Sequence, residues 1–468
     1  MERRFGAAMT GERGAAYRES LRGRRVLVVG LARSGVAACR LLLACGARVT
    51  GTDLRPVEVL GEDVKTLAES EVRLALGDHP AGLVETADLV VVSPGVPMTL
   101  PSLEAARRRG IPVIGELELA YRAMEADFIA ITGTNGKTTT TALVGALLGG
   151  GVRPLLVGGN IGTPLAARAL DFPPAGLVVA EVSSFQLETI EAFHPRVAAV
   201  LNLTPDHVDR HGSFVTYLEA KARVFLNQTP CDWAVLNADD PEVAALAGRT
   251  RARPVFFSRR RLLDEGISLR EGWIVARLDG REMEIAPVGE IFLRGAHNVE
   301  NVLAASACAL WAGLSPSELR DGIRAFRGVT HRIEWVRELD GVTYYNDSKG
   351  TNVASTVRAL ESFHEPIILI AGGRGKGQDF SPLATAARGR VKVAILLGED
   401  QGKLETVLAP VTGVVKVASM GEAVAHAQEL AAPGAVVLLS PACASFDMFR
   451  DFEHRGEVFK AAVHALEA

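Results

Sequence analysis

The sequence predicts an α/β protein of three domains, each built around a mostly parallel sheet. Short apolar runs of strand length alternate with longer helix-like segments along the chain, a pattern typical of parallel sheets covered by helices. The alternation restarts twice, so that we expect a flexible N-terminal extension over residues 1–20 and domains over 21–115, 116–328 and 329–468. The length of 468 residues agrees with this division, because one domain usually takes about 100–200 residues.

The first domain is expected to be Rossmann-like. The apolar strand Arg25–Val29 leads into the turn GLARSG, and a second strand ends at Asp53. The turn departs from the dinucleotide-binding pattern GxGxxG at Ala32, although Asp53 lies 23 residues after Gly30, near the usual offset of a ribose-binding acid. Taken alone, these residues leave two readings open, a weak nicotinamide-cofactor site and a structural turn without a ligand.

The central domain is expected to be a P-loop-type ATPase domain. A buried-type strand is followed by GTNGKT, residues 133–138, and then by a helix. Backbone N–H groups of such a turn and the helix N-terminus stabilise phosphate oxygens. Lys137 is placed to bridge the β- and γ-phosphates, and Thr138 to reach Mg²⁺. Ile131 stands where the eight-residue pattern needs glycine, so the loop is a shorter variant, and a plain glycine-rich turn is the alternative.

Two further side chains of the central domain are candidates for a metal site, and one lysine of this domain is also considered. Glu181 ends a buried strand, and His207 follows the next one in NLTPDHVDRH. Magnesium prefers oxygen ligands, so Glu181 is a more usual ligand for it than His207. The alternative interpretation of the segment around His207 is a polar turn without a metal. Lys221 lies on an expected helix over 214–227, where a solvated surface lysine is the ordinary interpretation. That interpretation is weakened because the chain has only nine lysines.

Seven short sequence motifs occur in this order along the chain: GTNGKT, EVSSFQLE, NLTPDHVDRH, GAHNVEN, HRIEW, NDSKGTN and SPACASFD. Together they resemble the Mur ligase family, which adds amino acids to UDP-N-acetylmuramate, and the resemblance runs from about residue 24 to the end. GTNGKT is shared with folylpolyglutamate synthases, which lack a UDP-type N-terminal domain. EVSSFQLE, and SPACASFD followed by Phe452, resemble the branch of the family that adds D-glutamate.

This resemblance implies a ligase of peptidoglycan synthesis that adds D-glutamate to UDP-N-acetylmuramoyl-L-alanine at the expense of ATP. The substrate carboxylate would take the γ-phosphoryl group, and the amine of D-glutamate would attack the acyl-phosphate. A tetrahedral intermediate then collapses to the amide, with ADP and phosphate released. The N-terminal domain would bind UDP, the central domain ATP, and a Rossmann-like C-terminal domain the amino acid. Two Mg²⁺ ions are implied as well.

The resemblance also implies individual roles. The implied ATP-binding residues are Gly133, Thr134, Asn135, Gly136, Lys137, Thr138, Thr139, Asn298, Asn301, Arg332 and Asp347. The implied UDP-substrate residues are Arg33, Ser34, Asp53, Arg55, Gly95 and Asn160. The implied D-glutamate residues are Lys349, Thr351, Lys376, Ser445 and Phe452. The implied metal ligands are Thr138, Glu181, His207 and a carbamylated Lys221, and the implied catalytic residues are Lys137, Glu181, His207 and Lys221.

Composition and motifs exclude several other classes of protein. A net charge of −4 gives no electrostatic case for nucleic acid or an anionic membrane. Five scattered cysteines suit a reducing cytoplasm, and no apolar run reaches the roughly 18 residues of a membrane span. We expect a monomer. An assignment as a dinucleotide-dependent oxidoreductase would leave the motifs GTNGKT and NDSKGTN unexplained. A diaminopimelate-adding ligase should carry a DNPR-like motif, which the sequence lacks.

Overall fold

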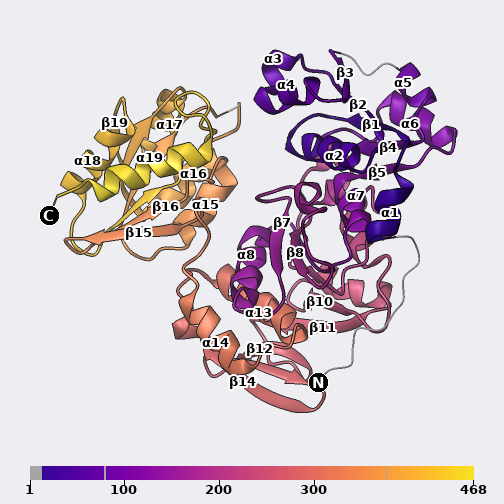
Figure 1. The fold of residues 1–468 in the computed structure, drawn as a ribbon. Helices are drawn as coiled ribbons and strands as arrows, with labels where there is room; N and C mark the ends of the chain where they lie inside the picture. Colours follow the sequence, from indigo (N-terminus) through magenta and orange to yellow (C-terminus); the bar gives the residue numbers. More distant parts are fainter. Residues whose placement is uncertain (1–12, 78–80, 376, 468) are drawn as a thin grey trace. The chain divides into compact units, whose positions relative to one another are not determined.

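The computed structural model describes residues 13–77, 81–375 and 377–467. Its contacts divide the chain into two compact units. The first comprises the chain up to Val288 together with Glu300–Gly322, and it contains two sheets. The second comprises Gly289–Val299 and the chain from Ile323 onward, and it contains one sheet (Figure 1). Each of the three sheets is the centre of one α/β domain.

The N-terminal domain is a five-stranded parallel sheet in the order β3-β2-β1-β4-β5. Its strands are β1 (Arg25–Val29), β2 (Arg48–Asp53), β3 (Arg73–Leu76), β4 (Leu89–Val92) and β5 (Val113–Gly115). Its helices are α2 (Arg33–Ala44), α3 (Val57–Leu60), α4 (Glu62–Ala68), α5 (Ala81–Glu85) and α6 (Pro101–Arg108). The strand order reverses between β1 and β4, and ligands bind at such a point outside the carboxyl ends of the strands. The Rossmann-like prediction is confirmed.

The central domain has nine strands in the order β14-β13-β12-β11-β10-β9-β6-β8-β7. These are β6 (Asp127–Thr132), β7 (Leu155–Gly159), β8 (Leu177–Glu181), β9 (Val197–Val200), β10 (Trp233–Asn237), β11 (Arg253–Ser258), β12 (Gly266–Arg270), β13 (Trp273–Leu278) and β14 (Arg281–Pro287). Pairing is parallel from β7 to β12 and antiparallel from β12 to β14. The antiparallel addition agrees with the short alternating stretches of the sequence.

Helices precede, connect and follow the strands of the central sheet. They are α7 (Glu116–Ala123), α8 (Lys137–Leu148), α9 (Ser184–Leu187), α10 (Val208–His211), α11 (Phe214–Ala222), α12 (Pro241–Ala245), α13 (Ala296–Trp311) and α14 (Pro316–Ala325). Four 3₁₀ turns accompany them: η1 (Leu165–Arg168), η2 (Arg223–Phe225), η3 (Leu246–Arg249) and η4 (Val288–Glu290). The helix expected over 214–227 is therefore shorter, since it tightens into η2 after Ala222.

The C-terminal domain has six strands in the order β15-β16-β20-β17-β18-β19, and only β15 is antiparallel to its neighbour. The strands are β15 (Glu334–Leu339), β16 (Val342–Asn346), β17 (Ile367–Gly372), β18 (Val391–Leu397), β19 (Gly413–Lys416) and β20 (Val436–Leu439). The helices are α15 (Val353–Glu361), α16 (Ser381–Ala387), α17 (Gln401–Leu408), α18 (Met420–Leu430) and α19 (Phe452–His464).

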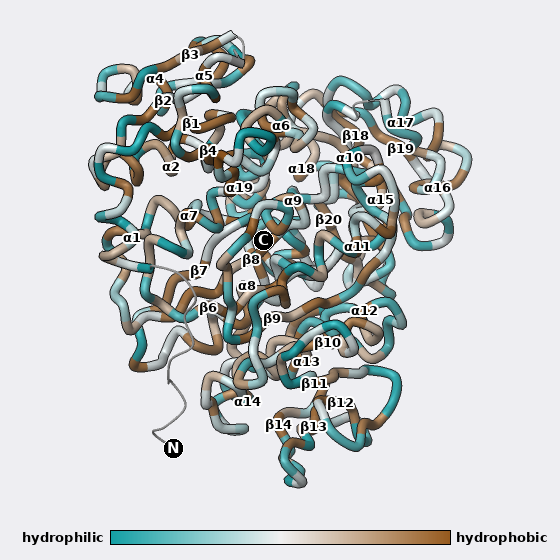
Figure 2. Tube along the Cα trace, turned by 90° about the vertical axis from the view of Figure 1, so that its right-hand side faces the viewer, coloured by the Kyte–Doolittle hydropathy of each residue, from teal (hydrophilic) through white to brown (hydrophobic). Residues whose placement is uncertain are grey.

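The inner strands of the sheets are apolar along their whole length. β8 and β9 are buried at every residue, and so is the part of β6 from Phe128 to Thr132. Brown, the colour of hydrophobic residues, runs along β6 and β8 in Figure 2. Strands covered on both faces require such continuous runs, which is why the sequence predicts them well. None of the helices in the described part of the chain has the length and hydropathy to cross a membrane.

The expectation of a flexible extension over residues 1–20 is wrong for the part that the structure describes. Residues Gly14–Ser20 form helix α1, whose Tyr17 is only 6% exposed. The Arg18 guanidinium donates to the carbonyl of Ala123 at 2.7 Å, where α7 ends without a helical partner for its last carbonyls. Because α1 owes its order to α7, more than 100 residues away, local sequence patterns could not predict it. Residues 1–12 lie outside the described residues.

We expect Tyr17→Ala to lower the free energy of unfolding by roughly 2–4 kcal/mol, because it removes a buried aromatic ring from the contact between α1 and α7. Urea unfolding followed by circular dichroism measures this change. Glu19→Ala is the matched control on the same helix, since Glu19 is exposed, and it should change little. Equal stability of the two variants would contradict the docked helix.

Candidate active site

The corner between β6 and α8 has the backbone that a phosphate loop requires. Gly133 and Gly136 have φ values of 146° and 80°, a region that side-chain-bearing residues rarely adopt. A Cβ atom on Gly136 would also lie 2.3 Å from Oδ1 of Asn301. The Lys137 ammonium donates to the carbonyls of Gly133 and Thr134 at 2.9 and 2.8 Å. The loop therefore wraps a cation at the N-terminus of α8.

Neighbouring elements hold this loop in place. The backbone N–H of Asn135 donates to Oδ1 of Asn202 at 2.8 Å, and the Asn202 amide donates back to the Asn135 carbonyl at 3.1 Å. The hydroxyl groups of Thr134 and Tyr217 lie 3.0 Å apart. Thr138 and Thr139, the first-turn hydroxyls of α8, are buried. Asn202 and Tyr217 were not predicted as site residues, although Asn202 is the first residue of the motif NLTPDHVDRH.

Lys221 is buried beside the phosphate loop. Its side chain leaves α11 and donates to the Gly133 carbonyl at 2.8 Å and to the Thr132 hydroxyl at 3.4 Å. It is 2% exposed, so the interpretation as a solvated surface lysine is wrong. Burial lowers the pKa of Lys221 well below its ordinary value, and the charge of Lys137 lowers it further, against the opposing effect of nearby carboxylates. A larger neutral fraction makes this amine a better nucleophile than an ordinary lysine.

Glu181 presents an unsatisfied carboxylate oxygen. It ends β8 and is 2% exposed. Oε1 accepts a hydrogen bond from the Asn160 amide at 2.7 Å, whereas Oε2 has no hydrogen-bond partner among the described residues. A buried anionic oxygen without a partner is costly, and a cation would remove that cost. Within the described residues no group of three histidine, cysteine, aspartate or glutamate side chains could hold a metal by itself.

His207 lies differently from the other predicted metal ligands. It precedes α10 in a left-handed conformation with φ 51°, and its side chain is 51% exposed. Its ring is 4.9 Å from the ring of Phe185, and Nε2 is 3.7 Å from the Asp206 carboxylate. The structure therefore brings Lys221 directly to the phosphate loop, while His207 stands on a neighbouring exposed turn.

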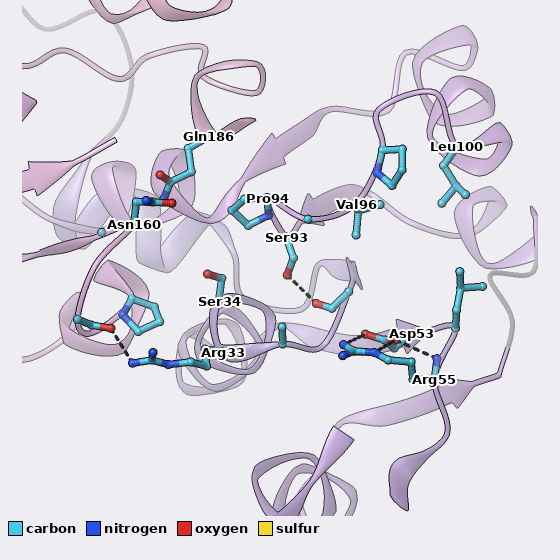
Figure 3. A pocket seen from close by; sticks show the side chains of 18 residues that line it. Arg33, Ser34, Asp53, Arg55, Ser93, Pro94, Val96, Leu100, Asn160 and Gln186 are labelled. Carbon is cyan, nitrogen blue, oxygen red and sulfur yellow. Dashed lines mark hydrogen bonds and ion pairs between the residues drawn. The ribbon is translucent and has the colours of Figure 1, made fainter. Parts of the chain in front are cut away.

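A cavity of about 640 Å³ lies between the N-terminal and central domains. Every residue predicted for the UDP substrate lines it: Arg33, Ser34, Asp53, Arg55, Gly95 and Asn160. Asp53 and Arg55 occupy one end, Asn160 and Gln186 the other, and Ser34 and Ser93 lie between them (Figure 3).

Asp53 is the anionic anchor of this cavity. Burial tends to raise the pKa of Asp53, but hydrogen bonds from the side chain and backbone of Arg55 and from the backbone of Leu31 lower it to about 2. Oδ2 accepts from the Leu31 N–H at 2.8 Å, and Oδ1 from Nε of Arg55 at 3.0 Å. Asp53 is thus ionised near neutral pH and can accept hydrogen bonds from ligand hydroxyl or N–H groups.

Several residues of the cavity wall were missed. Ser93, Gln186 and Leu54 line the cavity, and the Ser93 hydroxyl donates to the Gly30 carbonyl at 2.7 Å. Ser93 could have been predicted, because it begins the motif SPGVP directly after a buried strand. This strand, β4, lies at the switch point of the sheet, where ligands bind. The guanidinium of Arg33 donates to the Gly162 carbonyl at 2.7 Å, so it bridges to the loop after β7.

The adenine-side pair predicted from GAHNVEN lies on α13. Asn298 and Asn301 are one turn apart on this helix and both are buried. Oδ1 of Asn301 accepts from the Thr140 hydroxyl of α8 at 3.3 Å. The amide of Asn298 donates to the Arg294 carbonyl at 2.6 Å. Asn301 is therefore beside the phosphate loop within the first unit.

The C-terminal unit gathers its predicted residues after the ends of β16 and β20. Asp347 directly follows β16, and its Oδ2 accepts from the Ser440 hydroxyl at 2.7 Å. Lys349 lies with its ammonium 5.5 Å from the ring centre of Phe452, the first residue of α19. The remaining predicted residues are Thr351 on the loop before α15, the buried Ser445 after β20, and Arg332, whose buried Nε has no partner among the described atoms.

Lys376, predicted for D-glutamate, lies outside the described residues. Arg455 was missed because a lone arginine on a helix gives no signal in the sequence. It is 2% exposed, and its guanidinium donates to the carbonyls of Ser348 and Cys443 at 2.8 and 3.1 Å. Arg455 thereby ties together the two loops that carry Lys349 and Ser445.

Comparison with known proteins gives matches along nearly the whole chain. The Mur ligase MurD-like N-terminal domain matches residues 24–115, the Mur ligase middle domain 131–309, and the Mur ligase glutamate ligase domain 331–443. The UDP-N-acetylmuramoylalanine--D-glutamate ligase of Pelotomaculum thermopropionicum is 48% identical over 446 residues, 95% of this chain and 98% of that protein. The protein of the same name from Pelobacter propionicus is 50% identical over 447 residues, 95% and 100% of the two chains.

Solved structures show the same fold. UDP-N-acetylmuramate-alanine ligase MurC of Thermotoga maritima aligns with a TM-score of 0.58 at 20% identity, over 94% of this chain and 99% of that chain. MurF ligase of Thermotoga maritima, in complex with ADP, aligns with a TM-score of 0.57 at 16% identity, over 97% and 98%. At such low identity these likenesses establish the architecture of three α/β domains.

The buried Asp347 predicts a pH dependence of stability. Burial raises the pKa of Asp347 to about 6, against the hydrogen bond from Ser440 and the charge of Arg332. The unfolded chain releases this proton near pH 4, so the folded state binds more protons between pH 4 and pH 6. Stability should therefore fall as pH rises through this range.

Asp347→Asn should remove this part of the pH dependence. From pH 4 to pH 7 the wild type should lose on the order of 2 kcal/mol more than the variant. Denaturant unfolding at a series of pH values measures this difference. Asp321→Asn, at an exposed aspartate, is the control and should follow the wild type. Parallel curves for the wild type and Asp347→Asn would contradict the raised pKa.

Proposed function

Since the chain belongs to the Mur ligase family, we propose that it joins D-glutamate to UDP-N-acetylmuramoyl-L-alanine in an ATP-dependent reaction of peptidoglycan synthesis. The observation that carries this proposal is the end-to-end similarity to two D-glutamate ligases, at 48% and 50% identity over 95% of the chain. The buried lysine at the phosphate loop and the cavity between the first two domains support it. We further propose that the enzyme acts as a monomer in the cytoplasm, with domains over 21–115, 116–328 and 329–468.

The reaction needs ATP because a free carboxylate has no adequate leaving group. An oxygen of the substrate carboxylate attacks the γ-phosphorus, and the bond to ADP breaks. The amine of D-glutamate attacks the carbonyl carbon of the acyl-phosphate, and phosphate leaves with the former C–O bond pair. The amine loses one proton as the amide forms. Two anions meet in the first step, so cationic groups must lower their repulsion.

Residues of the phosphate loop supply the protein's share of this charge. Lys137 reaches the β- and γ-phosphates, and the N–H groups of residues 133–138 bind their oxygens. Asn298 and Asn301 are the residues proposed for the adenine side, and Arg332 and Asp347 are the residues of the C-terminal domain proposed to bind ATP. Lys137 donates to carbonyls of its own loop at 2.8–2.9 Å, and this position of its ammonium at the loop supports the proposed role.

Bound Mg²⁺ would neutralise the triphosphate and the acyl-phosphate oxygens. The unpartnered Oε2 of Glu181 and the Thr138 hydroxyl fit such a cation, since magnesium prefers oxygen. Within this proposal His207 helps to hold a second ion, from its exposed turn. Lys221 would serve that ion as a carbamate. Its neutral amine attacks carbon dioxide, loses a proton and becomes an anion with two oxygen donors, which arginine cannot form.

The two other substrates have proposed binding residues of their own in the first unit and in the C-terminal domain. Asp53, Arg55 and Gly95 bind the uridine diphosphate, with Arg33 and Ser34 beside it at the start of α2. Asn160 reaches the muramoyl part, at the far end of the cavity from Asp53 (Figure 3). In the C-terminal domain, Thr351, Lys376 and Ser445 offer two hydroxyls and a cation to the D-glutamate side-chain carboxylate. Lys349 and Phe452 complete that pocket.

Phosphate release tests the proposed function. The purified protein with Mg²⁺, ATP and UDP-N-acetylmuramoyl-L-alanine should release phosphate when D-glutamate is added, and neither L-glutamate nor meso-diaminopimelate should replace it. Lys137→Ala should lower turnover by roughly 100- to 1,000-fold, because a charge that stabilises the transition state is lost. Lys65→Ala, at an exposed lysine, should behave as the wild type. Absence of amino-acid-dependent release in the wild type would refute the proposal.

The carbamate has its own test. Lys221→Ala should lose about 100-fold or more in turnover, and short carboxylic acids such as acetate should restore part of it, because they can place two oxygens where the carbamate stood. The same acids should not help Lys137→Ala, whose lost group is a cation. Full activity of Lys221→Ala without any added acid would show that the carbamate plays no part.

A further inference from the structure

Glu116 is a buried carboxylate to which the proposed reaction gives no task. It is the first residue of α7 and directly follows β5, the last strand of the N-terminal sheet. It is 1% exposed. Oε1 accepts a hydrogen bond from the backbone N–H of Ala166 at 2.7 Å, while Oε2 has no partner among the described residues. Burial of a carboxylate costs free energy of hydration, and hydrogen bonds from the protein must offset this cost.

The partner of Glu116 lies at the end of a substrate-lining loop. Ala166 belongs to η1, which follows the stretch 159–164, called here the cavity loop. Gly159, Asn160, Gly162 and Pro164 of this loop line the cavity between the first two domains. The backbone N–H of Asn160 donates to the Glu181 carbonyl at 2.9 Å.

The cavity loop is thus fixed at three places. Its beginning is bound to β8 through Asn160, its middle to Arg33 through the Gly162 carbonyl at 2.7 Å, and its end to Glu116 through Ala166. The last two partners are the first residues of α2 and α7, which follow β1 and β5 of the N-terminal sheet. The position of Asn160 and Gly162 against a ligand therefore depends on how firmly Glu116 holds η1.

The surroundings of Glu116 are tight and polar. It lines a small cavity of about 10 Å³ together with Gln186 and Thr189, a volume that admits about one water molecule. A Cβ atom on the preceding Gly115 would lie 2.3 Å from the Thr189 hydroxyl. Gln186 also lines the large cavity, so the packing around Glu116 forms the back of the substrate wall.

We propose that Glu116 is a positioning residue that holds the cavity loop in place for a nucleoside-diphosphate sugar. This inference rests on the proposed function, which puts the UDP substrate in that cavity. Burial raises the pKa of Glu116 to about 7, and the hydrogen bonds from Ala166 and Leu165 oppose that rise. The side chain works through its length and its acceptor oxygen, so a shorter carboxylate cannot replace it.

Three substitutions separate length from charge. Glu116→Asp keeps the carboxyl group but cannot reach η1, and Glu116→Ala removes the acceptor. Both should raise the Kd for UDP-N-acetylmuramoyl-L-alanine about tenfold, the effect of one lost hydrogen bond to a charged acceptor. Glu116→Gln keeps the length and one acceptor oxygen and should raise it only about threefold. Isothermal titration measures Kd, and initial rates should show the same rise in KM with kcat little changed.

Glu118 offers a matched control on the same helix. It is fully buried and accepts backbone hydrogen bonds from residues 191, 192 and 193 at 3.0, 2.8 and 2.9 Å, none of which lines the large cavity. Glu118→Asp should lower the unfolding temperature without changing the Kd for the UDP substrate. Wild-type affinity in Glu116→Asp, or equal weakening in Glu118→Asp, would overturn the inference alone. Failure of the wild type to bind the UDP substrate would instead remove the proposed function.

Discussion

The carboxyl ends of parallel strands decide where chemistry can occur in this protein. Asp53 ends β2, the phosphate loop follows β6, Glu181 ends β8, and Asp347 follows β16. In a parallel sheet these ends meet at one edge, and the backbone turns there into a helix or loop. Polar side chains can be buried at this edge because loop N–H and carbonyl groups are free to bind them. Each of the three sheets therefore brings its proposed site residues together at one edge.

Burial of charge is the second constraint, and it separates the roles of similar side chains. Lys137 and Lys221 both donate to the Gly133 carbonyl, at 2.9 and 2.8 Å. Burial of Lys221 and the nearby charge of Lys137 lower the pKa of Lys221 well below its ordinary value. One lysine is thereby suited to bind phosphate and the other to react as a neutral amine. A sequence shows two lysines, but only the packing distinguishes them.

The sequence predicted the features that are local. GTNGKT, Asp53 and Glu181 could be predicted because glycine-rich turns and the ends of apolar strands can be recognised from a few neighbouring residues. The positions of the inner strands along the chain were predicted for the same reason, since β6 and β8 are continuous apolar runs. Helix α1 and Glu116 were not predicted as functional or ordered, because their partners, Ala123 and Ala166, are backbone groups far along the chain. Because every residue carries a carbonyl group and nearly every one an N–H group, a hydrogen bond to the backbone does not show in the amino-acid sequence.

Helix α7 explains why the first two sheets belong to one compact unit. Its N-terminal turn points two buried carboxylates into the central domain, Glu116 to η1 and Glu118 to the backbone of residues 191–193. Its C-terminal carbonyl at Ala123 accepts from Arg18 of α1. Both ends of the helix thus carry hydrogen bonds to other elements, so a hinge at this helix would have to break those bonds. The cavity loop is held by hydrogen bonds from both sides of this junction, and such fixed contacts favour a cavity wall whose shape is set before a ligand binds.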